Sequence, residues 1–393
     1  MTSAPALPFL PYGQQDLDEG DIAAVVEALR APYLTTGPGV DAFERAVAAR
    51  VGARFGVAIS NGTAALHAMY DALGVGPGDE VVVPAVTFLA TANAALYVGA
   101  RPVFCDVDPT SGLMTPEALA AAMTPRTRLV VPVHLAGNPT HTAALAEVAR
   151  AGGARLVEDA AHAVGAVDGG VAVGACAWSD MASFSFHPVK HITTAEGGMV
   201  MTNDEALAAR LRLFRSHGMT RDPAQLSRPD EGPWYYEQHA LGYNYRLTDL
   251  QCALGLSQLT RLDAFVAHRR ALAARYDALI AELPWLRPIA HERAGSRSSY
   301  HLYATLVDEE RLGLPKRELA RRLHARGVGT QVHYIPIPMQ PYYERLGWRA
   351  EEFPGALSYY RQTLSLPLFT RMGEGDVDRV VEALREVAAG AGA

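Results

Sequence analysis

The sequence is poor in the features that mark secreted, membrane-spanning and nucleic-acid-binding proteins. Its three cysteines, Cys105, Cys176 and Cys252, have no CxxC spacing, which argues against a zinc site and against a disulfide framework. No apolar run approaches the roughly 18 residues of a membrane span. Lys and Arg number 35 against 42 Asp and Glu, with no basic block to neutralise phosphodiesters, so nucleic acid is not an expected partner.

Length and composition indicate a globular protein with a large core and a second, smaller domain. Of the 393 residues, 49% are hydrophobic and 20% are charged. The segment Met1–Tyr12 lacks the basic region and apolar core of a secretion signal, so we expect a cytoplasmic protein. We expect an N-terminal arm (1–35), a large domain (36–262), and a connecting helix with a C-terminal small domain (263–393).

One lysine stands in a context unlike that of a surface lysine. The apolar run Met181–Phe186 leads through hydroxyl and imidazole groups to Lys190, in a turn rich in Thr and Gly before a second apolar run, Met199–Thr202. Gly197 and Gly198 permit a close backbone approach. A lysine in a partly desolvated pocket has a lowered pKa and can act as a nucleophile or form a Schiff base. The context favours a reactive lysine over a solvated amine.

Between residues 55 and 203, short β-branched runs alternate with helical segments. This alternation predicts an α/β fold in which parallel strands are joined by crossover helices. Ligands of such sheets collect at the carboxyl ends of the strands, where several of these runs carry polar residues. The candidate strands are Val57–Ile59, Glu80–Pro84, Val103–Cys105, Leu129–Val133, Arg155–Val157, Met181–Phe186 and Met199–Thr202.

The first polar strand end is Ser60–Thr63, which precedes a segment with apolar side chains at helical spacing. Free N–H groups at a helix start attract anions, and Gly62 would let a phosphate come close. An ordinary N-cap is the commoner reason for Ser or Asn at this place. The pattern is neither a P-loop nor a dinucleotide fingerprint, so both interpretations stay open on this segment alone.

Two further strand ends carry candidate site residues. Phe88 lies just beyond the run that ends at Pro84, where an aromatic ring belongs either to the core or to a site. In Leu156–His162, two acids and a histidine, among them Asp159 and His162, follow an apolar run. A carboxylate at a buried strand end needs a cationic or donor partner, because its desolvation is otherwise costly. A solvated loop acid is the alternative.

The rest of the chain is predominantly helical. The turn cluster Leu34–Gly39 carries two hydroxyls and is either a connecting loop or a ligand-facing one. Thr220–His239 is polar and is expected to be a surface loop. The expected helices are Asp16–Arg30, Glu205–Phe214, Leu250–Leu259, Asp263–Leu283, Lys316–Arg326 and Asp376–Val387, and the expected strands are Tyr300–Val307 and Gly329–Tyr334.

The order of these motifs resembles that of a known family. An anion-binding turn, an aromatic residue, a strand-end acid with a histidine and a Ser-x-x-x-x-Lys motif follow one another as in the fold-type I pyridoxal phosphate enzymes. In detail, the chain resembles the DegT/DnrJ/EryC1/StrS family of sugar aminotransferases, from Leu34–Pro38 to Leu364–Pro367. The most telling segments are Phe184–Gly198, Phe214–Met219 and Gln331–Pro336. The resemblance implies a mostly parallel seven-stranded sheet between helices and a smaller α/β C-terminal domain.

The resemblance also implies how the cofactor, pyridoxal 5'-phosphate, would be held. Lys190 would bind it as a Schiff base and carry protons during turnover. Asp159 would face the pyridine nitrogen and keep it protonated, so that the ring can act as an electron sink. His162 and Phe88 would lie on the two faces of the ring, although the family often has Gln in place of this histidine.

Other residues take their expected roles from the same resemblance. Asn244 would reach the phosphate in the site of the other subunit, which makes a homodimer a condition of activity. No metal ion is implied. The residues expected to hold the phosphate within one chain are Gly62, Thr63 and Ser185, and those expected near the substrate are Thr36, His187, Arg246, His333 and Tyr334.

The implied reaction moves the amino group of glutamate, through the cofactor, to C4 of a nucleotide-linked 4-keto-6-deoxy sugar. Within the family, the sequence is most similar to the UDP-4-amino-4,6-dideoxy-N-acetyl-β-L-altrosamine transaminases of the pseudaminic acid pathway. A different keto sugar, such as a perosamine-type GDP sugar or a dTDP sugar, is the main alternative.

Three other functions compete with this one. Some members of the family dehydrate the sugar and have histidine in place of the lysine, but Lys190 is present here. A regulator that keeps the fold and the cofactor without turnover is a second alternative, although the lysine, the acid and the phosphate-binding residues are all intact. The third is a binding or scaffold protein with a doubly wound sheet and no cofactor.

Overall fold

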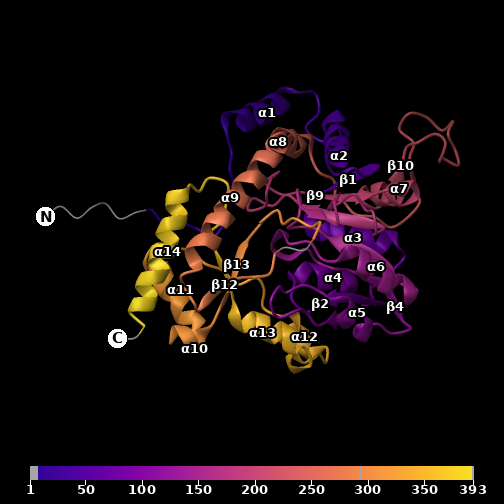
Figure 1. Ribbon diagram of the computed structural model, residues 1–393. Helices are drawn as coiled ribbons and strands as arrows, with labels where there is room; N and C mark the ends of the chain where they lie inside the picture. The colour runs from indigo at the N-terminus through magenta and orange to yellow at the C-terminus, as the bar shows by residue number, and fades with distance from the viewer. Residues whose placement is uncertain (1–7, 292–293, 392–393) are drawn as a thin grey trace.

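The computed structural model describes residues 8–291 and 294–391. A seven-stranded sheet with helices on both faces forms one part of the molecule, and a three-stranded sheet lies beside it with its own helices (Figure 1). Within the described ranges, no helix combines the length and the apolar character needed to cross a membrane.

The large sheet contains all seven strands expected between residues 55 and 203. Five neighbouring strands pair in parallel, and β9 (Gly198–Thr202) is antiparallel to both of its neighbours, so the expected mostly parallel seven-stranded sheet is confirmed. The connection from β8 to β9 is a loop without a crossover helix, and the chain therefore returns antiparallel. In spatial order the strands are β1 (Phe55–Ile59), β9 (Gly198–Thr202), β8 (Met181–Ser185), β5 (Arg155–Asp159), β4 (Thr127–Val130), β2 (Glu80–Pro84) and β3 (Arg101–Cys105).

Side chains alternate between two apolar cores on the faces of this sheet. In β2, Val81 and Val83 join the core under α3, α4 and α7, whereas Val82 points to the opposite face, under α5 and α6. The helices α2 and α8 cover the β1–β9–β8 end of that opposite face. These helices are α2 (Pro38–Val51), α3 (Gly62–Ala72), α4 (Leu89–Tyr97), α5 (Pro116–Ala122), α6 (Thr142–Ala151), α7 (Glu205–Phe214) and α8 (Asp249–Leu259).

The C-terminal part is built on an antiparallel sheet of β12 (Leu286–Pro288), β13 (Tyr303–Val307) and β14 (Thr363–Leu366). The helices α9 (Leu262–Ile280), α11 (Lys316–Ala325) and α14 (Glu374–Ala389) share its apolar core. Of these, α9 is the long helix that leads from α8 into the C-terminal part (Figure 1). The domain limits expected at 35/36 and 262/263 stay predictions.

The prediction of a strand at Gly329–Tyr334 in this part was wrong. Gly329 donates its N–H to the Leu10 carbonyl, and Gln331 exchanges two backbone hydrogen bonds with Ser365 as an isolated bridge. No ladder forms, because the backbone pairing does not continue beyond Gln331, and the following His333 and Tyr334 line a cavity.

The N-terminal helix packs on the large domain through a polar contact. Helix α1 (Glu19–Arg30) begins after Asp18, and its buried Asp21 accepts hydrogen bonds from Ser257 and Gln258 of α8. Arg261 forms an ion pair with the same carboxylate. The turn at Gly37 is fixed in a similar way, because its N–H donates to Asp249 at 2.8 Å.

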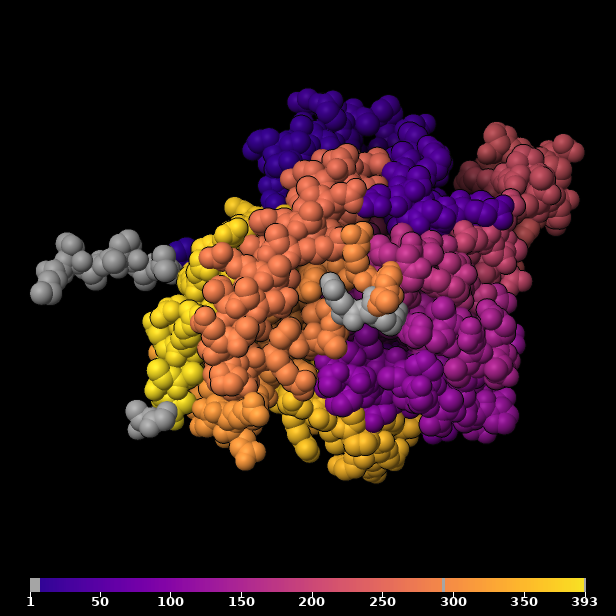
Figure 2. All heavy atoms as spheres, viewed as in Figure 1, coloured from indigo at the N-terminus to yellow at the C-terminus, as the bar shows by residue number. Residues whose placement is uncertain are grey.

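The segment Thr220–His239 is a surface loop, as expected. It projects from the large domain beside α7 and is closed at its base by a two-residue strand pair, β10 (Met219–Thr220) with β11 (Glu237–Gln238) (Figures 1 and 2). Glu237 accepts hydrogen bonds from Ser227 and Tyr235 and so ties the loop to itself.

Candidate active site

A cavity of about 880 Å³ lies at the carboxyl ends of the strands, between the large sheet and the segment 331–335. The parallel strands and the start of α3 bring together side chains that are far apart in the sequence. The predicted site residues that line this cavity are Gly62, Thr63, Phe88, Asp159, His162, Ser185, His187, Lys190, His333 and Tyr334.

Lys190 lies in the loop that joins β8 to β9. The loop is braced at both ends by backbone hydrogen bonds, since the Lys190 N–H donates to the His187 carbonyl and the Thr194 N–H to the Phe186 carbonyl. Burial lowers the pKa of Lys190 to about 7, and the nearby Asp159 carboxylate acts in the opposite direction. A substantial fraction of the amine is therefore neutral at neutral pH, as a nucleophile requires.

Asp159 ends β5 and is held by two donors. Its Oδ2 accepts a hydrogen bond from the Thr91 hydroxyl at 2.7 Å, and its Oδ1 accepts one from the Ala161 N–H at 3.1 Å. Because Thr91 gives its only proton to Asp159, the Thr87 hydroxyl donates to Thr91 across their 2.8 Å contact. Burial raises the pKa of Asp159, while Thr91, Ala161 and the positive charge of Lys190 oppose that rise.

The start of α3, where a phosphate site is predicted, packs closely against β8. Asn61 caps the helix by accepting the Ala64 N–H at 2.8 Å, and the helix provides no acceptor for the N–H groups of Gly62 and Thr63. A Cβ on Gly62 would lie 3.1 Å from the Ser185 Cβ. Glycine at this position therefore keeps the space between the helix start and β8 open, with the helix dipole directed into it.

His162 is buried beside Lys190 and has a partner at each ring nitrogen. The Ala136 N–H lies 3.3 Å from Nδ1, and the Tyr334 hydroxyl lies 3.2 Å from Nε2. The ring of His301 packs on it with centroids 4.4 Å apart. Burial and the positive charge of Lys190 lower the pKa of His162 well below its usual value, so this histidine is neutral.

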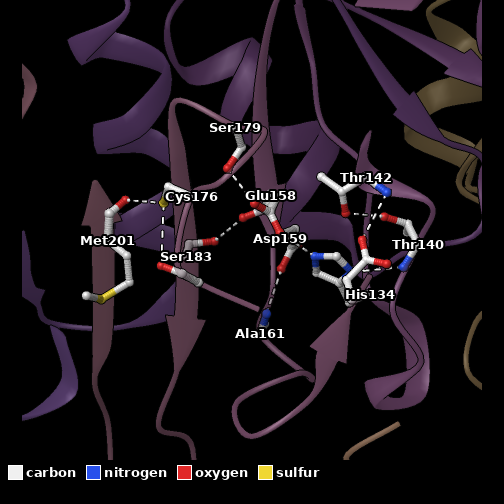
Figure 3. A network of polar contacts seen from close by, with 12 residues as sticks. His134, Thr140, Thr142, Glu158, Asp159, Ala161, Cys176, Ser179, Ser183 and Met201 are labelled. Atoms are coloured by element: carbon white, nitrogen blue, oxygen red, sulfur yellow. Dashed lines mark hydrogen bonds and ion pairs between the residues drawn. The ribbon is translucent and has the colours of Figure 1, made fainter. Parts of the chain in front are cut away.

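The acid next to Asp159 serves a different purpose. Glu158 points to the other side of β5, where it contacts His134 at 2.8 Å and accepts a hydrogen bond from Ser179 (Figure 3). The Thr140 N–H donates to Nδ1 of His134 at 3.0 Å, so the proton of this ring lies on Nε2 and is given to the carboxylate. Glu158 thus anchors the strand end that carries Asp159.

Three predicted site residues do not line this cavity. Thr36, Asn244 and Arg246 lie outside it; Thr36 and Asn244 are exposed and Arg246 is half-buried. Asn244 forms a backbone bridge with Ser216, which fixes its position at the surface. The contact of Asn244 with a second subunit, and the substrate contacts of Thr36 and Arg246, stay predictions.

Sequence reasoning missed several residues that touch or support the site. Thr91 was not singled out, although the spacing of Thr87, just before the N-cap of α4, and Thr91, four residues later in its first turn, could have indicated it. Tyr12 lines the cavity, and His301 packs against His162, but each residue comes from a segment with no recognisable motif. Only the tertiary fold brings them there.

The residues present fit pyridoxal 5'-phosphate. The N–H groups at the start of α3, beside Ser185, suit a phosphate group, and Lys190 has the lowered pKa of an amine that can bond to an aldehyde. Asp159 offers a buried carboxylate for a protonated pyridine nitrogen. Phe88 and His162 provide aromatic rings in the same cavity.

Comparisons with known proteins identify the family of the chain. The model of the DegT/DnrJ/EryC1/StrS aminotransferase family matches residues 15–385. The chain is 41% identical over 386 residues to the spore coat polysaccharide biosynthesis protein SpsC of Bacillus subtilis, with 98% of each chain covered.

Solved structures give the same result. The PLP form of the putative sugar aminotransferase Spr1654 from Streptococcus pneumoniae superimposes with a TM-score of 0.89 at 30% identity, covering 98% of this chain and 99% of that chain. PseC, an aminotransferase of pseudoaminic acid biosynthesis from Helicobacter pylori, gives 0.90 at 30%, covering 97% and 100%. DesI, solved in the presence of its TDP-sugar product, gives 0.85 at 34%, covering 97% and 93%. The chain therefore belongs to the DegT/DnrJ/EryC1/StrS aminotransferase family and is a sugar aminotransferase that depends on pyridoxal phosphate.

Proposed function

We propose that the protein transfers the amino group of glutamate to C4 of a UDP-linked 4-keto-6-deoxy sugar, as in pseudaminic acid-type sugar biosynthesis. The observation that carries the proposal is the joint presence of Lys190, Asp159 and the start of α3 in one cavity of about 880 Å³. That volume is near the upper end of the ~300–1,000 Å³ usual for small-molecule sites, which leaves room for a large substrate beside the cofactor. The similarity to PseC supports a substrate of this type.

Pyridoxal phosphate, when bound, supplies an aldehyde that takes up amino groups and a ring that withdraws electrons. Asp159, whose orientation is fixed by Thr91 and Ala161, would hold a proton on the pyridine nitrogen. Nζ of Lys190, with its pKa near 7, would take the proton from the amine-bearing carbon of the donor and deliver it to the carbon that carried the aldehyde of the cofactor. Gly62, Thr63 and Ser185 anchor the phosphate.

Roles at the subunit boundary complete the proposal. We assign to Asn244 a contact with the phosphate in the site of a second subunit, and to Thr36, His187, Arg246 and His333 contacts with the substrate. Such contacts make the homodimer the active unit.

A half-reaction tests the proposal. The purified protein is mixed with pyridoxal phosphate and glutamate, and the absorbance of the lysine-bound cofactor is followed. We expect conversion to the pyridoxamine form, and reversal by a UDP-linked 4-keto-6-deoxy sugar but not by its GDP counterpart. Lys190→Ala should abolish both steps while the protein stays folded. A Lys190→Ala variant that still turns over, or no conversion by any amino donor, would contradict the proposal.

A dTDP-linked keto sugar is the second candidate substrate. The specific observation in its favour is the likeness to DesI, whose structure was solved with a TDP-sugar product and which has 34% identity to this chain, slightly more than PseC. The same half-reaction separates the two, because reversal by the dTDP sugar alone would select this candidate.

A further inference from the structure

The hydrogen bonds of His162 fix the position of its ring proton. The Ala136 backbone nitrogen can only donate, and it lies 3.3 Å from Nδ1 of His162. Nδ1 must therefore be the unprotonated nitrogen, and the single proton of the neutral ring is on Nε2. A doubly protonated ring would place two N–H groups against each other and is excluded by the same contact.

This assignment in turn fixes the direction of the next hydrogen bond. Nε2 of His162 lies 3.2 Å from the Tyr334 hydroxyl oxygen, so the histidine donates and the tyrosine accepts. A phenol has one proton, and in this arrangement that proton is not used in the bond to His162. Tyr334 lines the cavity, and its hydroxyl proton is therefore available to a bound molecule.

The surrounding chain keeps His162 from leaving this arrangement. Ala136 lies in a tight turn with a φ of 61°, and the next residue, Gly137, has a φ of 82°. A Cβ on Gly137 would lie 2.8 Å from the backbone nitrogen of His301 and 2.9 Å from the backbone carbonyl oxygen of His162. The turn is therefore packed tightly against both residues. The ring of His301 packs against that of His162 at a tilt, with the ring centroids 4.4 Å apart.

We propose that Tyr334 donates a hydrogen bond to a proton-free oxygen in the cavity, and that His162 is the positioning residue that keeps this phenol proton directed there. The oxygen is a carbonyl or carboxylate oxygen of the amino donor or acceptor, or the deprotonated phenolic oxygen attached to the pyridine ring of the cofactor. This inference rests on the proposed function, because amino-group transfer brings both kinds of oxygen into the site. It also gives His162 a role beyond that of a flat ring beside the cofactor.

The first test needs neither cofactor nor substrate. The protein is labelled with ¹⁵N-histidine, its imidazole nitrogen signals are recorded, and His162 is assigned by their loss in His162→Gln. We expect the Nε2–H tautomer, a changed Nε2 shift in Tyr334→Phe, and no change in Tyr342→Phe, which removes an exposed phenol elsewhere. A proton on Nδ1, or an Nε2 chemical shift that is unchanged in Tyr334→Phe, would overturn the proposal.

The second test finds the source of the oxygen. The half-reactions with glutamate and with 2-oxoglutarate are measured for Tyr334→Phe, together with the affinity of the apoprotein for pyridoxal phosphate. A loss of about tenfold in kcat/KM at unchanged cofactor affinity places the oxygen on the substrate. A comparable loss of cofactor affinity with an altered cofactor spectrum places it on the cofactor. No change in either would overturn the donor role of Tyr334.

These outcomes can be told apart from a failure of the proposed function. If the wild-type protein gives no half-reaction with glutamate, the proposed function fails, but the tautomer of His162 and its response to Tyr334→Phe are still measured on the apoprotein. The inference about the His162–Tyr334 pair therefore stands or falls on its own result.

Discussion

Lys190 has a low pKa because the groups packed around it offer little charge to balance its own. His162, His301 and His333 all have pKa values lowered by burial and by the lysine itself, so they stay neutral. Asp159 is the acid that favours protonation of Lys190, and its effect is smaller than that of burial. The amine is thus kept reactive by desolvation, which also makes it costly to protonate in the folded protein.

This cost predicts a pH dependence of stability. The ordinary lysine pKa of 10.5 falls to about 7 in the folded protein. Below pH 7 the amine is protonated in both states and the folded state carries the full cost. Between about pH 7 and pH 10.5 the unfolded chain binds more protons, so the free energy of unfolding rises with pH. Chemical denaturation of the apoprotein across this range measures the effect.

Lys190→Met is the matched variant for that measurement. It keeps the length of the side chain without the titrating amine, so the difference in unfolding free energy between wild type and variant isolates the lysine from other titrating groups. We expect the variant to be more stable by a few kcal/mol near pH 6 and the difference to shrink as the pH rises. A difference that stays constant with pH would show that the Lys190 pKa is not lowered.

Thr91 should matter because it is one of two donors to a buried carboxylate. In Thr91→Val the shape is retained, but Asp159 loses its 2.7 Å hydrogen bond. We expect a loss of stability of about 1–3 kcal/mol and weaker binding of pyridoxal phosphate by the apoprotein. Thermal or chemical unfolding and a cofactor titration measure the two effects.

Thr87→Val is the control for that prediction. It leaves the contact between Thr91 and Asp159 in place and removes the hydroxyl that donates to Thr91. Its effect on cofactor affinity should therefore be the smaller of the two. Equal effects would mean that the threonines act by packing alone.

At the scale of elements, the predicted phosphate site depends on the close approach of α3 to β8. Gly62→Ala adds a methyl group 3.1 Å from the Ser185 Cβ, a contact tighter than normal packing. We expect weaker binding of pyridoxal phosphate, because the added group displaces Ser185 or fills the space beside the first N–H groups of α3. Titration of the apoprotein with the cofactor measures this change.

Gly375→Ala provides the comparison. This glycine lies in the first turn of α14, where an added Cβ meets nothing within 4 Å. The substitution makes the same chemical change at a helix start, so its effect on stability should be small and its effect on cofactor affinity absent. If Gly62→Ala behaves in the same way, the tight approach of α3 is not needed for cofactor binding.

The elements that the sequence predicted well are those with a strong local pattern. The β2 strand, Glu80–Pro84, and the α7 helix, Glu205–Phe214, have the limits that the sequence predicts. Both combine a regular apolar pattern with clear stop signals. The loop that carries Lys190 could be predicted equally well, because a lysine, hydroxyl side chains and glycines lie together between two apolar runs.

The elements that the sequence could not predict depend on distant partners. Gly329–Tyr334 has a strand-like composition, but its hydrogen bonds go to Leu10 and Ser365 as single bridges. Thr91 reaches Asp159 only because β2 and β5 lie in the same sheet. The proton position on His162 depends on Ala136, which no motif links to it. These features belong to the tertiary fold and leave no local signal.

At the scale of the whole molecule, α1 carries an apolar stripe that faces outward. Its buried side, with Asp21, packs on α8, whereas Ile22, Val26 and Leu29 lie at i, i+4 and i+7 and are exposed. An exposed apolar stripe on a packed helix is typical of a protein interface. It supports the homodimer that the proposed role of Asn244 requires.

Mixed dimers test whether the active sites are shared. Chains with Lys190→Ala and chains with Asn244→Ala are coexpressed with different tags, and the heterodimer is purified. If Asn244 serves the other subunit's site, the site with an intact lysine also receives an intact asparagine. The heterodimer should then have about half the wild-type activity, although both parent homodimers are impaired. Activity no higher than that of the parents would contradict a shared site.

A second heterodimer, with both substitutions in one chain, controls for effects of the substitutions on expression or stability. A chain with both substitutions is paired with a wild-type chain, so the heterodimer has the same two changes in one subunit. In a shared site, the intact Lys190 now faces the substituted position 244 of its partner, and the heterodimer should be impaired. If Asn244 instead serves its own subunit, the two heterodimers exchange their activities. The comparison therefore decides which subunit Asn244 serves, from two proteins of identical composition.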